Sequence, residues 1–551
     1  MGVLGEEGSL ARLVARARRP LGRLVLRREG RLGDLDRLGR GTSARAAQAT
    51  PDGGDTPSGP RVLVVSLRAW TAHNVYESVL AQALRLRGAQ VAMLTCGGGQ
   101  PLCELGRARR AWPRPCDRCG WYTDRIAGAA RMPHYRLADG LPWGGDARRA
   151  PVEPPPSADS KDPFRVSEIS VPWMLKSTDV EASHLGAVME RDFAVAAAGV
   201  SSSIERALDD FHPDIVVMLN GLFASERVIR EAALARDCRV VSYEIGLRAN
   251  SLVFSAGTPA PRYDTDGAWP QFSDRPLGDR QASAIVGLLA ARTEGNAAHV
   301  RYYNDPVSDA GHVRAALDVP AGDRVISMFT NLAWDSAALG CDIGYDSMFD
   351  WMSDVVHTVA ELDHTTLVVR VHPAEERWGT MQPATEALGR LPDNVRVIGP
   401  DQPLSSYALL DFTDLALTYT TTVGLEAATQ GRPIAVAGAT HYRGRGFTYD
   451  LDSPAELHTL LRSGGWRIDD DQVELAIRYA FMFFFRVMVP FPAVRLKNSK
   501  DGVPDDFPND PDGLRPGVDP YLDFVCERIL DGGDFILPDE LALPDQVGAD
   551  G

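Results

Sequence analysis

The chain has 551 residues, 44% of them hydrophobic, which is enough for two to four domains with buried cores and excludes a globally disordered protein. Its formal net charge of −16 argues against nucleic acid as the main partner. The longest apolar run, residues 480–491, is too short to cross a bilayer, and no secretory segment follows Met1. We therefore expect a cytoplasmic protein.

Residues 1–60 are expected to form a basic segment followed by a linker. Within residues 8–40, leucines and valines recur at helical spacing with arginines between them. This pattern fits a helix on an anionic membrane surface, at the inner face of the cell membrane, and it fits equally a basic tail without a specific partner. Residues 46–60 are rich in Pro, Gly and Asp, so the folded part is predicted to begin at Arg61.

An α/β domain is predicted over residues 61–300. A β-rich run at 61–67, a helical stretch and a second β-rich run at 90–95 form a βαβ unit. Two more apolar runs, at 214–221 and 238–246, are typical of buried strands with a helix between them. The first half of the chain therefore predicts a parallel sheet with helices on its faces.

A segment rich in Cys, Arg, Trp and Pro interrupts this domain at residues 96–165, and we expect it to be an insertion held by local chemistry. Four of the seven cysteines fall here with the spacing C-x6-C-x12-C-x2-C. Four thiolates at this spacing fit a structural zinc site or an iron–sulfur cluster, whereas buried thiols or a redox pair are the alternative. These residues are Cys96, Cys103, Cys116 and Cys119.

A second α/β domain is predicted over residues 310–465, where five β-rich runs alternate with helical stretches. The fold class is therefore α/β, with two tandem Rossmann-like domains and a Cys-rich insertion in the first. Residues 466–551 are expected to form a C-terminal helix and an acidic tail. Phenylalanines at 481–485 cover all sides of that helix, which favours burial in a groove between domains over contact with a membrane.

Polar residues follow two strands of the second domain, at the sheet edge where parallel strands bind ligands. His372 follows one strand, and Thr420, Thr421, Thr422 and Gly424 lead from another into a helix that carries Glu426. The hydroxyl-rich turn suits a phosphate, and Glu426 suits ribose hydroxyls. A helix N-cap and a plain turn are the alternatives. Neither loop has the glycine spacing of an ATPase or dehydrogenase motif.

Four stretches of this domain also carry a family resemblance: RVHPAEE (370–376), QPLSS (402–406), TYTTTVGLEAATQGRPIAVAG (418–438) and HYRGRGFTYD (441–450). They resemble the C-terminal domain of capsule and surface polysaccharide glycosyltransferases of the GT-B fold, including relatives of Kdo transferases. The likeness covers residues 320–450. The N-terminal half is similar to the acceptor domain of such enzymes only in outline, through residues 66–91.

The resemblance implies a nucleotide-sugar site in the second domain. His372 would contact the donor phosphate, the turn at 420–422 would cradle it, and Glu426 would hold the ribose. It also implies that catalysis needs no bound metal, because helix dipoles and basic side chains stabilise the departing nucleotide. Other residues expected to line the same cleft are Arg370, Ser405, Ser406, Gly424, Tyr442 and Arg443.

The catalytic base is expected to come from the first domain, across the cleft, if the transfer inverts the anomeric centre. His73 and Glu244 are the candidates, and His73 is the first choice because its near-neutral pKa suits proton removal. Asn331, Trp334 and Asp335 follow the first strand of the second domain and should face the same cleft. Asp335 fits a sugar hydroxyl or a helix cap.

These features predict a glycosyltransferase that moves a sugar from a nucleotide-sugar donor to a surface or capsular polysaccharide or a glycolipid acceptor. Two other functions remain open. One is an epimerase or hydrolase of nucleotide sugars, which also uses two facing domains. The other is a non-catalytic protein in which the cysteines bind a metal or a partner. The sequence does not choose between inversion and retention.

Overall fold

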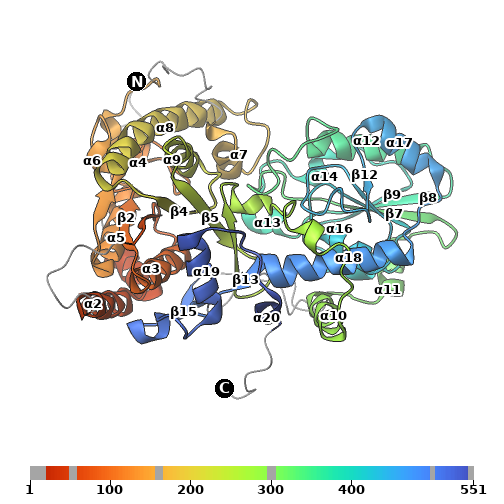
Figure 1. Cartoon of the computed structure of the whole chain (residues 1–551). Coiled ribbons are helices and arrows are strands. Elements are labelled where there is room, and N and C mark those ends of the chain that lie inside the picture. The colour runs from red at the N-terminus through yellow and green to blue at the C-terminus, as the bar shows by residue number, and fades with distance from the viewer. Residues whose placement is uncertain (1–19, 49–58, 155–165, 294–305, 497–502, 544–551) are drawn as a thin grey trace, which may run out of the picture.

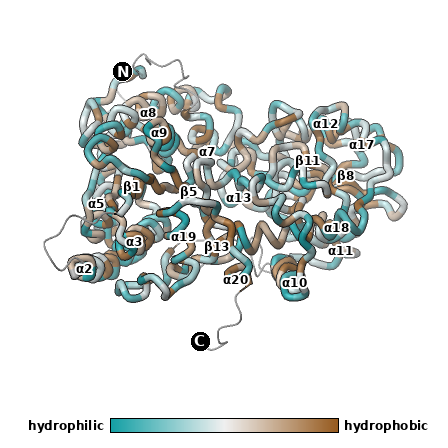
Figure 2. The backbone as a smooth tube through the Cα atoms, viewed as in Figure 1, coloured by the Kyte–Doolittle hydropathy of each residue, from teal (hydrophilic) through white to brown (hydrophobic). Residues whose placement is uncertain are grey.

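The computed structural model describes residues 20–48, 59–154, 166–293, 306–496 and 503–543, which form two α/β domains (Figure 1). Each domain is built around its own, mainly parallel sheet, one of seven strands and one of six. Hydrophobic stretches of the chain lie in the strands and around β13 (Met488–Pro490), as Figure 2 shows. The α/β class predicted from the alternating pattern is therefore confirmed. Within the described ranges, every helix is too short or too polar to span a lipid bilayer.

The first sheet has the strand order β13-β6-β5-β4-β1-β2-β3. Five neighbouring strands run parallel to one another, namely β5, β4, β1, β2 and β3. Strand β6 is antiparallel to both of its neighbours, β5 and β13. The strands are β1 (Arg61–Val65), β2 (Gln90–Thr95), β3 (His134–Arg136), β4 (Ile215–Leu219), β5 (Arg239–Ile245) and β6 (Ser251–Ala256).

Helices cover both faces of the first sheet, because successive strand residues alternate between them. Val62 and Val64 of β1 belong to a core shared with one set of helices, and Leu63 and Val65 to a core shared with another. The first set is α2 (Leu32–Gln48), α3 (Thr71–Leu86), α5 (Cys116–Ala130) and α19 (Pro520–Asp531), and the second is α8 (His184–Phe211) and α9 (Ala224–Leu234).

The second sheet is parallel throughout, with the order β12-β11-β10-β7-β8-β9. Its inner strands are fully buried on both faces, as is typical of a doubly wound sheet. The strands are β7 (Arg324–Phe329), β8 (Thr365–Arg370), β9 (Val395–Ile398), β10 (Leu415–Thr418), β11 (Ile434–Val436) and β12 (Tyr449–Asp450). Its main flanking helices are α12 (Met348–Ala360), α17 (Pro454–Ser463), α15 (Ser406–Leu410), α16 (Val423–Thr429) and α18 (Asp470–Met482).

The N-terminal segment differs from the prediction that folding begins at Arg61. Leu26, Leu35 and Leu38 are buried in the core of the first domain. Helix α2 packs so closely on α5 that a Cβ at Gly39 would lie 1.9 Å from the carbonyl oxygen of Ala129. This part of the basic segment therefore packs on the first domain, whereas Leu21, Leu24 and Val25, which belong to the predicted membrane helix, are exposed. Residues 8–19 lie outside the described residues.

The Cys-rich segment is more integral to the first domain than an insertion would be. Strand β3 adds an edge strand to the sheet by pairing with β2, and α5 contributes Tyr122 and Ile126 to the core. The sequence showed no period here because the elements are short and joined by proline and glycine turns. The predicted insertion at 96–165 is thus not confirmed as a separate body.

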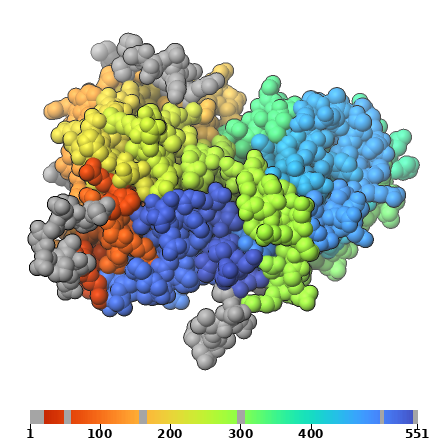
Figure 3. All heavy atoms as spheres, viewed as in Figure 1, coloured from red at the N-terminus to blue at the C-terminus, as the bar shows by residue number. Residues whose placement is uncertain are grey.

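The C-terminal segment returns from the second domain to the first. After α18, a π-helical turn at Phe483–Val487 leads into β13, which pairs with β6. Helix α19 then packs on α3, and Arg239 Nη2 donates to the carbonyl oxygen of Leu530 at 2.6 Å. Figure 3 shows this dark blue segment against the first domain. The phenylalanines at 481–485 are buried, as predicted.

Candidate active site

The loops that follow β7, β8 and β10 lie together at the carboxyl edge of the second sheet, because these three strands are neighbours. The backbone N–H of His372 donates to Thr330 Oγ1 at 3.0 Å. The backbone N–H of Thr420 donates to Asn331 Oδ1 at 3.1 Å. The His-Pro loop and the threonine turn are thus joined through the loop after β7. We call Thr330, Asn331, His372 and Thr420–Thr422 the second-sheet edge.

His372 is held as a neutral imidazole. Burial, with a smaller contribution from the Arg370 guanidinium, lowers the pKa of His372 to about 4. Its Nδ1 accepts a hydrogen bond from the backbone N–H of Ala374 at 3.1 Å. This contact assigns the ring proton to Nε2. The imidazole can therefore act at neutral pH as a hydrogen-bond donor toward an anion, without carrying a charge.

The threonine turn is shaped from below by an aromatic residue. Tyr442 is fully buried, and its hydroxyl donates to the carbonyl oxygen of Thr421 at 2.6 Å. A Cβ at Gly424 would lie 2.2 Å from that hydroxyl, so only glycine fits at this position. Thr422 does not cap helix α16 with its side chain, which excludes the simple N-cap reading for that residue. Tyr442 and Gly424 therefore support the turn.

Arg370 and the two serines are used within the domain. Arg370 is 2% exposed, and its Nη1 donates to the carbonyl oxygen of Gly399 at 3.0 Å while Nε donates to Ser406 Oγ at 3.4 Å. Ser405 Oγ caps α15 by accepting from the backbone N–H of Tyr407 at 3.2 Å. These three side chains fix the loop after β9 beside His372.

Arg443 and Arg445, which follow β11, also have partners. Arg443 Nη1 donates to the carbonyl oxygen of Val436 at 2.8 Å, and Nη2 pairs with Asp452 at 2.6 Å. Arg445 Nη2 donates to Thr265 Oγ1 at 3.0 Å, in the link between the two domains. Both cations therefore brace the chain around β11 and the interdomain link.

Glu426 forms a buried ion pair that the sequence did not reveal. Its side chain is 1% exposed and accepts from Arg292 Nη2 at 2.8 Å and from Nε at 3.0 Å. The hydroxyl of Tyr407 donates to the other carboxylate oxygen. Arg292 belongs to helix α10 (Asp279–Thr293), far away in sequence. A ribose at Glu426 would have to share the carboxylate with this arginine.

In the first domain, His73 lies in an aromatic environment near the start of α3. Its Nδ1 is 3.4 Å from the hydroxyl of Tyr243, which donates to Glu77 Oε1 at 2.9 Å. Burial, with a smaller contribution from Arg68, lowers the pKa of His73 to about 4. Burial raises the pKa of Glu77 to about 8. His73 is therefore neutral at pH 7, and the carboxyl group of Glu77 is mostly protonated.

Glu244 lies at the end of β5 and faces the second domain. Its Oε2 accepts from Asn220 Nδ2 at 3.0 Å, and Oε1 accepts from the backbone N–H of Ile245 at 2.9 Å. Burial raises the pKa of Glu244, and the nearby carboxylate of Asp335 raises it further. Burial likewise raises the pKa of Asp335. The carboxylate of Asp335, in the second domain, thus raises the pKa of Glu244, in the first domain, across the domain boundary.

Lys176 joins this pair, although no sequence pattern singled it out. Its Nζ lies 3.9 Å from the ring centre of Trp173 and 3.8 Å from that of Trp334, an indole of the other domain. Burial lowers the pKa of Lys176 to about 8, and Asp335 opposes this shift. The carbonyl oxygen of Lys176 accepts from the backbone N–H of Met381 at 2.9 Å. We call Lys176, Glu244, Trp334 and Asp335 the interdomain junction.

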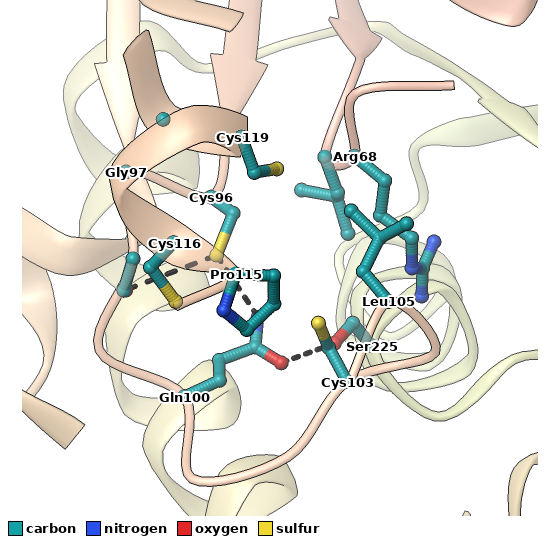
Figure 4. Close-up of a pocket in the computed structure, with 13 residues that line it drawn as sticks. Arg68, Cys96, Gly97, Gln100, Cys103, Leu105, Pro115, Cys116, Cys119 and Ser225 are labelled. Atoms are coloured by element: carbon teal, nitrogen blue, oxygen red, sulfur yellow. Dashed lines mark hydrogen bonds between the residues drawn. The ribbon is translucent and has the colours of Figure 1, made fainter. Parts of the chain in front are cut away.

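The four clustered cysteines line a single pocket in the first domain (Figure 4). All seven cysteines are free thiols, and Cys238, Cys341 and Cys526 are buried in the core. Across the described ranges, no three or more His, Cys, Asp or Glu side chains are arranged to hold a metal ion. The predicted structural zinc is therefore not supported, because the thiols surround a space and do not meet at one point.

Residues 321–462 match the family model described as "Capsule polysaccharide biosynthesis protein". The matched segment is about a quarter of the chain and contains the whole second-sheet edge. The predicted resemblance of residues 320–450 to capsule polysaccharide biosynthesis proteins is thus confirmed. Among curated proteins, none matches the chain significantly.

Solved structures resemble the chain at low sequence identity. The beta Kdo 2,4 transferase KpsC of Thermosulfurimonas dismutans is 17% identical over 54% of this chain and 86% of its own, with a TM-score of 0.31. The UDP-GlcNAc 2-epimerase of Neisseria meningitidis is 12% identical over 76% and 98%, with a TM-score of 0.24. The glycosyltransferase SnogD of Streptomyces nogalater is 16% identical over 77% and 95%, with a TM-score of 0.25.

Proposed function

We propose that the chain is a glycosyltransferase of GT-B architecture that transfers a sugar from a nucleotide-sugar donor to a surface or capsular polysaccharide or a glycolipid. One observation carries the proposal. The segment that matches capsule biosynthesis proteins joins His372 to Thr420 at one sheet edge, beside a junction where the other domain presents Glu244. A donor site and a proton acceptor from opposite domains are what a transfer between two substrates requires.

The second-sheet edge is the proposed donor site. The Nε2–H of His372 and the polar atoms of the turn at 420–422 offer hydrogen bonds to a diphosphate without adding a charge. In a site with little water, such fixed donors stabilise the negative charge that develops on the departing nucleotide. The proposed catalysis therefore needs no metal ion. Arg370, Ser405 and Ser406 would hold the loop that shapes this site.

Glu244 is the better supported of the two candidate bases. It faces Asp335 of the second domain, and its raised pKa brings it closer to the neutral range in which a general base works best. His73 has a lowered pKa and packs beside Tyr243 and Trp70. It fits an acceptor-positioning residue. An epimerase would act on the donor alone, and the family match to capsule biosynthesis proteins favours transfer.

We infer contact with an anionic membrane surface through the start of the described chain, which would keep the protein at the inner membrane face. Leu21, Leu24 and Val25 are 69%, 65% and 45% exposed, and Arg27 and Arg28 beside them are exposed. Exposed apolar residues among arginines suit a bilayer interface. A Leu21→Glu, Leu24→Glu double variant should lose binding to anionic liposomes; retained binding would refute this inference.

The donor site is tested by nucleotide binding. Nucleoside diphosphates should raise the melting temperature of the protein by mass action. His372→Ala should reduce that rise, because it removes the Nε2–H donor, whereas His357→Ala should not, because His357 is exposed on α12 of the same domain. Equal rises in the two variants would contradict the assignment. With donor and acceptor present, wild type should form product, and with donor alone it should only hydrolyse slowly.

A further inference from the structure

The four cysteines that line the pocket come from two segments that meet at one end of the first sheet, and residues after β1 and in α9 complete the lining. Cys96 and Cys103 lie on the loop after β2, and Cys116 and Cys119 lie in the first turn of α5 (Figure 4). The rest of the lining is largely apolar or glycine, and includes Leu67, Leu105, Pro115, Gly97 and Gly98. Four thiols from 24 residues of sequence thus surround one space.

The arrangement of these thiols does not support a single tetrahedral ion. Zinc–sulfur bonds of about 2.3 Å would bring four ligand sulfurs within roughly 4 Å of one another. No three His, Cys, Asp or Glu side chains in the described residues approach in that way. In Figure 4, Cys103 lies across the space from Cys96, Cys116 and Cys119. Ligands placed around a space suit a group with several metal atoms, each of which binds one thiolate.

The sulfurs already receive hydrogen bonds from N–H donors. The backbone N–H of Ala69 lies 3.4 Å from Cys119 Sγ, and Gln100 Nε2 lies 3.5 Å from Cys96 Sγ. Gln100 is fixed in turn because its Oε1 accepts from Ser225 Oγ at 3.0 Å. Hydrogen bonds to sulfur and low solvent access stabilise and tune thiolate-bound clusters.

One arginine and two carboxylates lie beside the pocket. Arg68 lines the pocket and pairs with the buried carboxylates of Glu104 and Glu226, whose negative charges offset its own. Burial raises the pKa of all four thiols, that of Cys116 to about 12. The thiols are therefore protonated at neutral pH in the absence of a ligand.

We propose that Cys96, Cys103, Cys116 and Cys119 bind a [4Fe–4S] cluster. The cluster is delivered preassembled, with one thiolate of a carrier on each iron. On binding, each cysteine thiol of the chain releases one proton and its thiolate replaces one carrier thiolate on one iron; the carrier thiolate leaves and takes up a proton. No electron transfer is part of this step. The four single bonds place one sulfur at each corner of a cube of iron and sulfide, so no two thiols need to share an atom.

Such a cluster would brace the loop that leads from β1 into α3. Cys119 Sγ contacts the backbone N–H of Ala69, and the neighbouring Trp70 packs against His73 and Trp173. Trp173 in turn contacts Lys176 of the interdomain junction. The proposed role of the cluster is therefore structural, and the proposal is independent of sugar transfer.

The full chain, purified without oxygen from cells supplied with iron, provides the test. We expect about four irons and four acid-labile sulfides per chain, with a visible absorption that dithionite bleaches. Zinc at one per chain with no iron would overturn the proposal, because it would identify a single-ion site. Absence of both metals after reconstitution with ferrous iron and sulfide would overturn it as well.

Two variants locate the site. Cys103→Ser and Cys119→Ser should each lose most of the bound iron and the visible absorption. Cys238→Ser is the matched control, because Cys238 is a buried thiol of the same domain that donates to the carbonyl oxygen of Pro213 at 3.0 Å. If the first two variants do not fold, stripping iron from wild type and restoring the absorption with iron and sulfide gives the same information. Iron retained in both variants would refute the assignment.

Discussion

The carboxyl edges of the two sheets are built from different interactions. At the first sheet, Arg68 is 5% exposed and pairs with two buried carboxylates, Glu104 and Glu226. At the second sheet, neutral groups hold the loops together, as in the contacts of His372 with Thr330 and of Thr420 with Asn331. The difference fits a division of tasks, because a neutral edge can receive an anionic phosphate, whereas the first-sheet edge also carries Glu244, the carboxyl group proposed to accept a proton.

The two kinds of edge also differ in what a substitution costs. Breaking a buried ion pair leaves an uncompensated charge, which typically destabilises by about 3–5 kcal/mol. Losing one neutral hydrogen bond costs about 1 kcal/mol. Substitutions at the first-sheet edge should therefore change folding or proton transfer, and substitutions at the second-sheet edge should change ligand binding with little effect on folding.

The largest expected effect is that of Glu244→Gln on catalysis. If Glu244 is the general base, the substitution should lower kcat by about 10²–10⁴-fold. Burial raises the pKa of Glu244, and a base works only when deprotonated. In wild type, kcat/KM should therefore rise with pH through a limb above the usual glutamate range, and this limb should vanish in the variant.

His73→Asn is the comparison for that experiment. Because the pKa of His73 is lowered to about 4, a histidine base would place the acid limb near pH 4. We expect the higher limb to persist in His73→Asn. A limb near pH 4 that disappears in His73→Asn would instead assign the base to His73, and would remove Glu244 from the mechanism.

Arg68→Met should produce the largest loss of stability. It leaves Glu104 and Glu226 buried without a cation, and the free energy of unfolding in urea should fall by about 3–5 kcal/mol. Arg136→Met is the control, since Arg136 makes only exposed ion pairs with Asp124 and Asp139, worth less than about 1 kcal/mol. Adding Glu104→Gln and Glu226→Gln to Arg68→Met should recover part of the loss. Equal losses for Arg68→Met and Arg136→Met would show that the buried ion pairs of the first-sheet edge stabilise the fold no more than exposed ion pairs do.

Glu77→Gln tests the buried carboxyl beside Tyr243 through pH. The pKa of Glu77 is raised to about 8 in the folded protein, above about 4.3 for an unfolded glutamate. The folded state then binds more protons between these values, so wild type should lose stability as pH rises through that window, on the order of 5 kcal/mol in total. Glu77→Gln should lack this dependence. Urea unfolding at several pH values measures it, and parallel curves for both proteins would rule the shift out.

Much of the fold follows from local pattern. The apolar runs at β1, β4, β7 and β8 are buried on both faces, so their hydrophobicity alone predicted parallel sheets. The second-sheet edge was equally predictable, because its residues directly follow strands that are neighbours. Short βα loops keep such residues close to the sheet, and sequence position then fixes spatial position.

Features that depend on distant contacts could not be predicted. Glu426 reads as a ligand residue from its helix, yet Arg292 of α10 neutralises it. Tyr442 and Gly424 read as cleft residues, and their packing under the turn appears only when β11 and α16 are placed. Strand β13 joins the first sheet after the chain has completed the second. No periodicity within a segment encodes a partner more than a hundred residues away.

Lys176→Met tests the interdomain junction, where the two sheet edges meet. It has the smallest expected effect on the free energy of unfolding. Two opposing contributions act on this ammonium: burial lowers its pKa to about 8, whereas the indoles of Trp173 and Trp334 attract the cation by about 1 kcal/mol or somewhat more. Because these contributions oppose each other, the substitution should change the free energy of unfolding at pH 7 by less than the loss of about 3–5 kcal/mol expected for Arg68→Met.

The pH dependence of that small difference separates the two contributions. A folded pKa below the value of about 10.4 for an unfolded lysine means that the unfolded state binds more protons between pH 8 and 10.4. Wild type should then gain stability relative to Lys176→Met as pH rises through this window. If the cation–π contacts dominate instead, wild type should lose stability there, because deprotonation removes the cation.

Lys176→Met should also reduce the rise in melting temperature that nucleoside diphosphates produce if the cation assists the second-sheet edge. An unchanged rise would confine anion binding to the neutral groups of that edge.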